Sequence, residues 1–218
     1  MSHETWIPKT LQHKEHNFLG KLIAFEGLDG SGKSSLAQLT SEYLAAQGID
    51  NMVTKIPTNE VRQTKYWMEF YSNPSYEHET VDPFGISLLI FADRILHISN
   101  AVVPALKRGV WVICDRYVLS SFVYHFSEVH INLASRILEP DLKILVDVEG
   151  NESARRVKKR GEHETESEIQ SKNDIRNRYL KLAEKNKYAV VNTTNQSAAD
   201  SFSQILPLIK ALDPNRIK

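Results

Sequence analysis

Residues 27–34 contain the feature that most restricts how this chain can fold. They read Gly-Leu-Asp-Gly-Ser-Gly-Lys-Ser, which matches the spacing G-x-x-x-x-G-K-[ST] of a phosphate-binding loop, or P-loop. The apolar run 21–26 precedes this loop, and a helical pattern over 34–46 follows it. Because a P-loop connects a strand to a helix, the chain is expected to contain a β–loop–α unit of an α/β fold.

Each residue type in this loop has a chemical reason. Glycines let the backbone turn its N–H groups toward a phosphate, at torsion angles that a side chain disfavours. Lys33 is expected to bridge the β- and γ-phosphates, and the Ser34 hydroxyl is expected to ligate Mg²⁺. The loop therefore predicts a site for ATP and Mg²⁺. The candidate nucleotide-binding residues are Gly27, Asp29, Gly30, Ser31, Gly32, Lys33, Ser34 and Ser35.

Short apolar runs alternate with helical patterns along the rest of the chain. The predicted strands are mostly continuous apolar runs rather than alternating ones, as expected for strands that are covered on both faces: 21–26, 51–55, 110–115, 142–148 and 188–192. The helical patterns lie between and after them, at 34–46, 83–108, 152–160, 169–186 and 197–211. This alternation predicts a three-layer α/β/α sandwich around a five-stranded parallel sheet.

Turn and cap residues agree with this division. Asp82-Pro83 is typical of an N-cap followed by proline at the first helical position. Gly48 and Gly109 follow predicted helices, where a left-handed C-cap is expected. Because 20–218 contains no linker-like segment, it is interpreted as one domain. Residues 1–19 are interpreted as a poorly ordered N-terminal extension.

Composition excludes several function classes. Lys plus Arg and Asp plus Glu both total 27, so the formal charge is zero, and a nucleic-acid partner is not expected. No uninterrupted apolar run approaches the ~20 residues of a membrane span, and the N-terminus lacks the apolar core of a signal peptide. A cytoplasmic protein is therefore expected. The single cysteine, Cys114, is interpreted as a small buried residue of a strand.

A second candidate site lies at the end of the run 110–115. Asp115 is its last residue, and ligands of open α/β sheets bind at the carboxyl ends of the strands. A carboxylate at that place either supports Mg²⁺ or caps a turn, and the nearby P-loop favours the metal role. Ser34 and Asp115 are thus the candidate metal ligands. Arg116 follows and is suited to binding phosphate oxygens bidentately.

From these residues onward the chain resembles the thymidylate kinase family of P-loop nucleoside monophosphate kinases. The matching segments run in order over most of 20–195: Phe25-Glu26-Gly27-Leu28-Asp29 with the rest of the P-loop, Pro57, Phe91-Ala92-Asp93-Arg94, Pro104-Ala105-Leu106, Asp115-Arg116-Tyr117 with Ser120 and Tyr124, Pro140-Asp141, Leu145-Val146-Asp147-Val148, Arg160-Gly161 and Arg178-Tyr179-Leu180. The Asp115-Arg116-Tyr117 segment and the carboxylate inside the loop are the more specific parts.

The resemblance implies a role for each residue group. Asp29 would accept a hydrogen bond from the sugar 3′-hydroxyl of the acceptor monophosphate. Arg94 and Arg116 would hold the acceptor phosphate in line with the γ-phosphate. The nucleoside pocket would contain Phe91, Tyr117, Ser121 and Tyr124, and the catalytic residues would be Lys33, Asp115, Arg116, Arg156 and Arg160.

Three departures from the family pattern leave alternatives open. Ile90 stands where a base-stacking Phe is usual, and Phe91 either stacks at a changed angle or belongs to the core. After the second strand, the family often has an acidic residue next to Pro57 or an arginine soon after it. This chain has Thr58 and Asn59 there, which leaves Lys55 or Arg62 to take that role. The segment 155–168 is either a mobile lid with catalytic cations or a solvated basic face followed by an acidic tip, and Thr165 stands near an expected Arg.

The function expected from the resemblance is phosphoryl transfer from ATP to a deoxynucleoside monophosphate, with dTMP the leading acceptor. Two alternatives remain: a P-loop kinase for another nucleotide or nucleoside, and a nucleotide-binding protein that has lost transfer activity. The expected partners are small nucleotides, and the family resemblance also implies a homodimer formed through the long helix.

Overall fold

The computed structural model describes residues 10–71, 81–124, 128–159 and 166–213. Its centre is a five-stranded parallel sheet of order β2-β3-β1-β4-β5. The strands are β1 (Leu22–Glu26), β2 (Asn51–Lys55), β3 (Trp111–Asp115), β4 (Leu142–Asp147) and β5 (Ala189–Asn192). Each of the five predicted runs forms a strand, which confirms the predicted sheet to within a residue or two.

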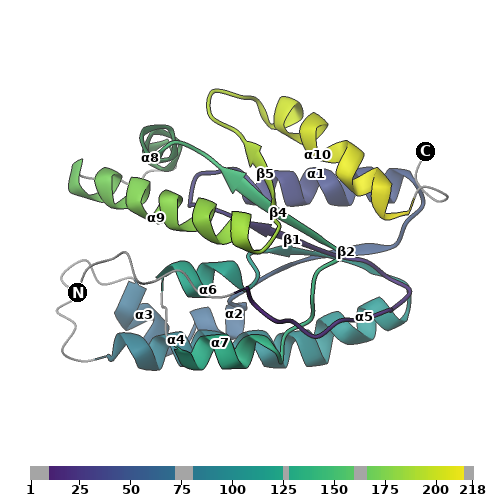
Figure 1. Cartoon of the computed structure of the whole chain (residues 1–218), viewed down its shortest axis with the longest axis horizontal. Helices are drawn as coiled ribbons and strands as arrows, with labels where there is room; N and C mark the ends of the chain where they lie inside the picture. The colour runs from purple at the N-terminus through teal and green to yellow at the C-terminus, as the bar shows by residue number, and fades with distance from the viewer. Residues whose placement is uncertain (1–9, 72–80, 125–127, 160–165, 214–218) are drawn as a thin grey trace.

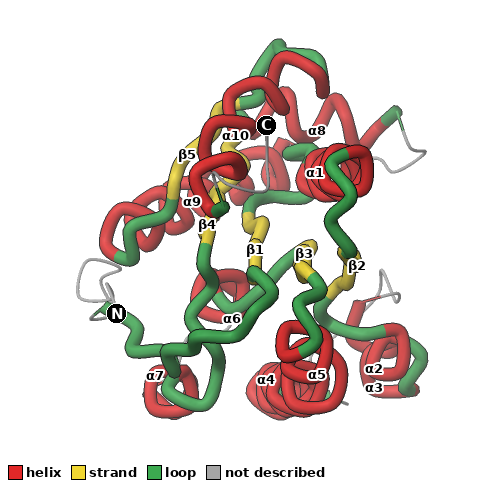
Figure 2. The backbone as a smooth tube through the Cα atoms, turned by 90° about the vertical axis from the view of Figure 1, so that its right-hand side faces the viewer, coloured by secondary structure: helices red, strands yellow, loops and turns green. Residues whose placement is uncertain are grey.

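Helices cover both faces of the sheet, as the continuous apolar strands predicted (Figure 1, Figure 2). On one face, Ile23 and Phe25 of β1 pack with α1 (Lys33–Ala46) and α10 (Ala198–Leu212). On the other face, Leu22 and Ala24 belong to a larger apolar cluster. That cluster includes residues of α4 (Pro83–His97), α5 (Val103–Lys107), α6 (Leu119–Tyr124), α7 (Glu128–Ala134) and α9 (Glu166–Lys185). The three-layer prediction is confirmed.

The helix signals hold with one irregularity. The Asp82 carboxylate accepts hydrogen bonds from the N–H groups of Phe84 and Gly85, and Gly48 and Gly109 have φ of 73° and 84°. The predicted helix 83–108 is continuous, but η2 (Ile98–Val102) is a π-helical turn between α4 and α5. Pro104 follows this turn, and its missing N–H explains the changed hydrogen-bond pattern. The remaining helices are α2 (Asn59–Arg62), α3 (Lys65–Tyr71) and α8 (Gly150–Lys158).

Within the expected N-terminal extension, residues 10–19 make a few contacts with the rest of the domain. Leu11 is buried, and its N–H donates to Asn186 Oδ1 at 2.8 Å. Lys14 forms a parallel bridge with Leu138. These contacts were missed because a single buried leucine and one backbone bridge leave no periodic pattern. Residues 1–9 lie outside the described part of the chain.

One helical stretch, Pro83–Lys107, is long and apolar enough to cross a membrane by length and composition alone. In the sequence, Asp93 and Arg94 interrupt this stretch, so it contains no uninterrupted apolar run. Core helices meet the same criterion, and here both polar residues make contacts within the protein. Asp93 accepts hydrogen bonds from the N–H and hydroxyl of Thr58 at 2.8 and 2.6 Å, and Arg94 is completely buried. The stretch therefore contributes buried residues such as Phe91 to the core, while others such as Leu96 are exposed.

Candidate active site

The P-loop leaves β1 at the carboxyl edge of the sheet, and two of its glycines are needed for close approaches. Gly27 has φ of 143°, and a Cβ there would lie 2.3 Å from the carbonyl oxygen of Val146 in β4. Gly30 has φ of 79°, and a Cβ there would lie 2.7 Å from the carbonyl oxygen of Ser153 in α8. The loop is therefore held between two neighbouring segments at torsion angles that favour glycine.

Lys33 begins α1 and is 5% exposed. Its Nζ donates to the Leu28 carbonyl oxygen at 2.5 Å and lies 3.9 Å from Asp29 Oδ1. Burial, together with the charge of Arg116, lowers the pKa of Lys33 to about 7 despite three nearby carboxylates. A buried ammonium of this kind gains strongly from an added anion, as expected of a phosphate ligand.

Ser34 and Asp115 meet, as predicted for metal ligands. The Ser34 hydroxyl donates to Asp115 Oδ2 at 2.6 Å, although the two residues come from α1 and β3. Asp115 is 4% exposed, and its Oδ1 has no hydrogen-bond partner among the described residues. A buried carboxylate oxygen without a donor fits a cation. No cluster of three His, Cys, Asp or Glu occurs in the described ranges, and one carboxylate with phosphate oxygens is usual for Mg²⁺.

Arg116 joins the loop to the adjacent helices. Its Nη2 forms an ion pair with Asp29 Oδ1 at 2.5 Å, and its Nη1 donates to the Gly27 carbonyl and the Tyr179 hydroxyl, both at 3.2 Å. Its own φ is 72°, an unusual value for a non-glycine residue. Partial desolvation opposes it, but Arg116 and Lys33 lower the pKa of Asp29 to about 2. The arginine is thus fixed beside the loop, with a charged partner that remains ionised at neutral pH.

A cavity of about 220 Å³ opens next to this pair, and we call it the acceptor cavity. Arg94 lies in its wall and is completely buried. Its Nη1 donates to the Ser121 hydroxyl at 2.7 Å, whereas its Nε and Nη2 have no partner in the described part of the chain. These two donors fit an oxygen of a bound ligand. The full lining is Asp29, Lys55, Pro57, Arg62, Trp67, Tyr71, Ile90, Arg94, Arg116, Ser120, Ser121 and Tyr124.

Two predicted pocket residues belong to the core instead. Phe91 is completely buried, and its ring lies 5.1 Å from that of His130 between centroids, whereas its neighbour Ile90 lines the cavity. Phe91 lies three residues before Arg94, and here that helix position faces the core. Tyr117 is also completely buried, and its hydroxyl donates to the Leu138 carbonyl oxygen. The remaining predicted pocket residues, Asp29, Arg94, Arg116, Ser121 and Tyr124, do line the cavity.

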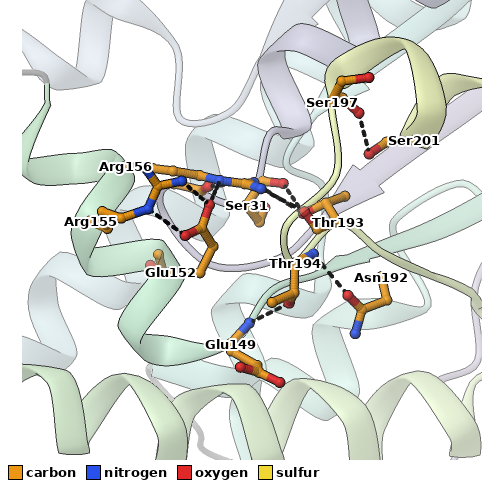
Figure 3. A network of polar contacts seen from close by, with 12 residues as sticks. Ser31, Glu149, Glu152, Arg155, Arg156, Asn192, Thr193, Thr194, Ser197 and Ser201 are labelled. Atoms are coloured by element: carbon orange, nitrogen blue, oxygen red, sulfur yellow. Dashed lines mark hydrogen bonds and ion pairs between the residues drawn. The ribbon is translucent and has the colours of Figure 1, made fainter.

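A second cavity, of about 520 Å³, lies on the other side of the loop, and we call it the donor cavity. Gly30, Ser31, Gly32 and Ser35 line it together with residues of α8 and of the segment after β5. Arg156 donates there to four acceptors: Glu152 Oε1 at 2.7 Å, the Thr193 carbonyl at 2.6 Å, the Thr193 hydroxyl at 3.2 Å and the Gly30 carbonyl at 3.4 Å. Figure 3 shows its contacts with Glu152 and Thr193. Arg156 is therefore a fixed wall residue rather than a free cation of a lid.

Other lid residues are only partly described. Arg155 is paired with Glu152 through two hydrogen bonds, at 2.6 and 2.7 Å (Figure 3). Arg160 and Thr165 lie outside the described residues, as does most of the acidic tip. Glu152 lies four positions before Arg156, a spacing at which oppositely charged side chains of a helix commonly pair. This spacing would have predicted the contact between Glu152 and Arg156. Thr193, Trp67 and Tyr71 also line the two cavities, and they were not predicted because they belong to no motif.

The fold and the site define the class of this protein. A P-loop with a buried lysine, a serine–aspartate pair suited to Mg²⁺ and two cavities on either side of the loop are features of P-loop phosphotransferases. A family model described as thymidylate kinase matches residues 25–205. The chain therefore belongs to the thymidylate kinase family.

Individual relatives agree with this assignment at moderate identity. A probable thymidylate kinase of Pyrococcus abyssi is 35% identical over 197 residues, which cover 88% of this chain and 96% of that protein. The thymidylate kinase of Carboxydothermus hydrogenoformans is 33% identical, over 79% of this chain and 89% of its own length. That of Idiomarina loihiensis is 32% identical, over 88% and 97%. Such values are consistent with a divergent member of the family.

Proposed function

We propose that this chain transfers the γ-phosphate of ATP to dTMP, which yields ADP and dTDP. The observation that carries the proposal is the position of the P-loop between two cavities. Asp29 lines the acceptor cavity, and Gly30 to Gly32 line the donor cavity. A loop shared in this way brings a donor phosphate and an acceptor phosphate to the same few atoms. Such positioning provides most of the catalysis in phosphoryl transfer.

The residues of the site divide the work by position. Lys33 and the loop N–H groups bind the donor phosphates, and Ser34 with Asp115 holds Mg²⁺, which neutralises phosphate charge when bound. Arg116 lies beside the loop, where it reaches an acceptor phosphate next to Asp29. Arg94, with two unpaired donors, binds an oxygen of the acceptor deeper in the cavity. ATP as donor follows from the family, and the donor cavity provides room for its base and ribose.

The acceptor is assigned as dTMP because the curated relatives are named thymidylate kinases. Ile90 in place of an aromatic ring favours the second candidate, a kinase for another nucleotide. A panel of dTMP, dUMP, dCMP, dGMP, AMP and UMP separates the two by ADP release from ATP. We expect the highest kcat/KM for dTMP. Background turnover with all six, together with tight binding of Mg²⁺ and ATP, would instead indicate a nucleotide-binding protein without transfer activity.

Asp115→Asn tests the metal site. The amide keeps the shape of the side chain but removes the charge that attracts Mg²⁺, so we expect the apparent Mg²⁺ affinity to fall by about 10- to 100-fold. The measurement is a Mg²⁺ titration of transfer at fixed ATP. Asp50→Asn is the matched control, because Asp50 is exposed and precedes β2, at the opposite edge of the sheet. Equal Mg²⁺ midpoints for the two variants would contradict the assignment.

Two further properties belong to the proposal. A homodimer would bury exposed apolar side chains of the long helix, such as Leu96, which is 60% exposed. We also propose that the chain acts on small nucleotides in the cytoplasm. Its formal charge of zero gives no general attraction to nucleic acid.

A further inference from the structure

The acceptor cavity has an aromatic wall that the proposed function has not used. Trp67 and Tyr71 of α3 both line the cavity. Their rings lie 4.1 Å apart between centroids, with planes inclined by 32°. The two residues are four positions apart on one helix, and at this separation their rings lie largely face against face while both border the cavity. We call this pair the α3 aromatic wall.

The part of the lining that α4 contributes is not aromatic. The long helix α4 contributes Ile90 and Arg94 to the lining, while its Phe91 points into the core. Tyr124 of α6 is the other described aromatic residue of the lining. A planar base that enters the cavity therefore meets rings mainly from α3, and α4 offers an aliphatic side chain and a guanidinium.

Charge places the base end of the cavity near this wall. Arg116 and Asp29 mark the phosphate end, because they adjoin the P-loop. The remaining lining includes uncharged groups suited to a base, among them Ile90, Ser121 and the α3 aromatic wall. With the acceptor phosphate at Arg116, we place the base against these groups, although Lys55, Arg62 and Arg94 also line the cavity.

The wall is also held in place before any ligand binds. The Arg62 guanidinium carbon lies 5.1 Å from the centre of the Trp67 ring, and Arg62 Nε donates to the Pro57 carbonyl oxygen at 2.8 Å. Trp67 further packs against the apolar cluster of Val81, Ile86 and Ile90. Contacts on several sides fix the indole, so little side-chain entropy is lost when a base binds.

We propose that the α3 aromatic wall, and Trp67 above all, contacts the pyrimidine base of the acceptor and replaces the ring that α4 does not provide. Aromatic side chains are well suited to this role because any base has a flat π-surface and polar edges. Trp67 is then a specificity-determining residue for the base and not for the sugar phosphate. This inference rests on the proposed function, since it places the acceptor monophosphate in this cavity.

Kinetics of Trp67→Leu and Trp67→Phe test the proposal. Leucine keeps apolar volume without a ring, so we expect the KM for dTMP to rise by about 5- to 30-fold, while the KM for ATP is unchanged. Trp67→Phe should restore most of the affinity. Inhibition by deoxyribose 5-phosphate, which has no base, should be equal in wild type and Trp67→Leu. Tyr66→Leu is the matched control, because Tyr66 is half exposed on the same helix and does not line the cavity.

Tryptophan fluorescence gives a readout that does not depend on turnover. The chain has two other tryptophans. Trp111 is completely buried in β3, and Trp6, which lies outside the described residues, is removed for this experiment by the substitution Trp6→Phe. In this Trp6→Phe background, dTMP should change the emission of Trp67 and deoxyribose 5-phosphate should not. Adding Trp67→Phe should abolish the change.

The outcomes separate the inference from the proposed function. If wild type phosphorylates dTMP but Trp67→Leu has an unchanged KM, or loses affinity equally for deoxyribose 5-phosphate, the inference is overturned and the function stands. If wild type phosphorylates no monophosphate, the proposed function fails. In that case the fluorescence titration with dTMP still tests the inference. If dTMP changes the emission of Trp67 no more than deoxyribose 5-phosphate does, the inference is overturned.

Discussion

Replacing Lys33 with methionine is expected to remove phosphoryl transfer and to raise the free energy of unfolding measured without nucleotide. Transfer is lost because methionine carries no charge to bind the donor phosphates where Nζ lies beside the loop, and kcat should fall by at least about 10²–10³-fold. Stability rises because burial is the largest influence on this lysine and disfavours its charge in the folded chain. Methionine fills similar space without a charge. Each 1 kcal/mol gained would raise Tm by about 2–4 °C.

The pH dependence of stability provides the sharper test. The unfolded lysine titrates near 10.5 and the folded one at about 7, so between these values the unfolded chain binds more protons. The contribution of Lys33 to folding therefore becomes more favourable as pH rises through this window. Thermal melts from pH 7 to pH 10 should show this rise in wild type and a smaller one in Lys33→Met. The exposed Lys185→Met is the control, and equal pH profiles for the two variants would contradict the argument.

Replacing Arg116 with methionine is expected to lower kcat/KM for dTMP by about 10²–10³-fold, with a smaller effect on ATP affinity. The reason is position: the guanidinium lies between Asp29, Gly27 and Tyr179, which hold it at the phosphate end of the acceptor cavity. Steady-state kinetics with each substrate varied in turn make the measurement. Arg108→Met, an exposed arginine between α5 and β3, is the control. A loss confined to ATP affinity would show that Arg116 serves the donor instead.

The same variant has a second signature at Asp29. In wild type the pKa of Asp29 is lowered to about 2, and without Arg116 it should rise toward its ordinary value of 3.8. A carboxylate with a lowered pKa contributes stability above about pH 4, and this contribution is lost as pH falls toward 2. The effect on stability is small because the side chain is 73% exposed. Carboxyl NMR of Asp29 in the two chains measures the pKa directly.

Much of the fold and part of the site followed from local signals. The three central strands were predictable because each is a short, largely apolar run that is mostly buried, and the caps at Asp82, Gly48 and Gly109 depend only on nearby backbone torsions. The P-loop was predictable because its function imposes fixed residue types at fixed spacing. The meeting of Ser34 with Asp115 also followed, since the carboxyl ends of parallel strands share one edge of the sheet.

The roles of other residues depend on where their side chains point or on partners far away in the sequence, and these roles were not predictable in the same way. Whether Ile90 or Phe91 lines the acceptor cavity depends on how α4 is rotated about its axis against its neighbours. The spacing of the two residues from Arg94 does not determine that rotation. Tyr117 is buried because its hydroxyl finds the Leu138 carbonyl, and Arg156 is fixed by Thr193, 37 positions away. Such contacts arise from packing between elements and leave no local pattern.

The sequence by itself therefore determined the sheet, the phosphate loop and the serine–aspartate pair, because short-range chemistry specifies each of them. Only the tertiary structure decided which side of α4 lines the acceptor cavity, that Arg156 is a wall of the donor cavity, and that α3 brings Trp67 and Tyr71 to the acceptor cavity. The physical reason is that side-chain direction and cavity shape depend on how helices pack against the sheet, and that packing involves residues far apart in the chain.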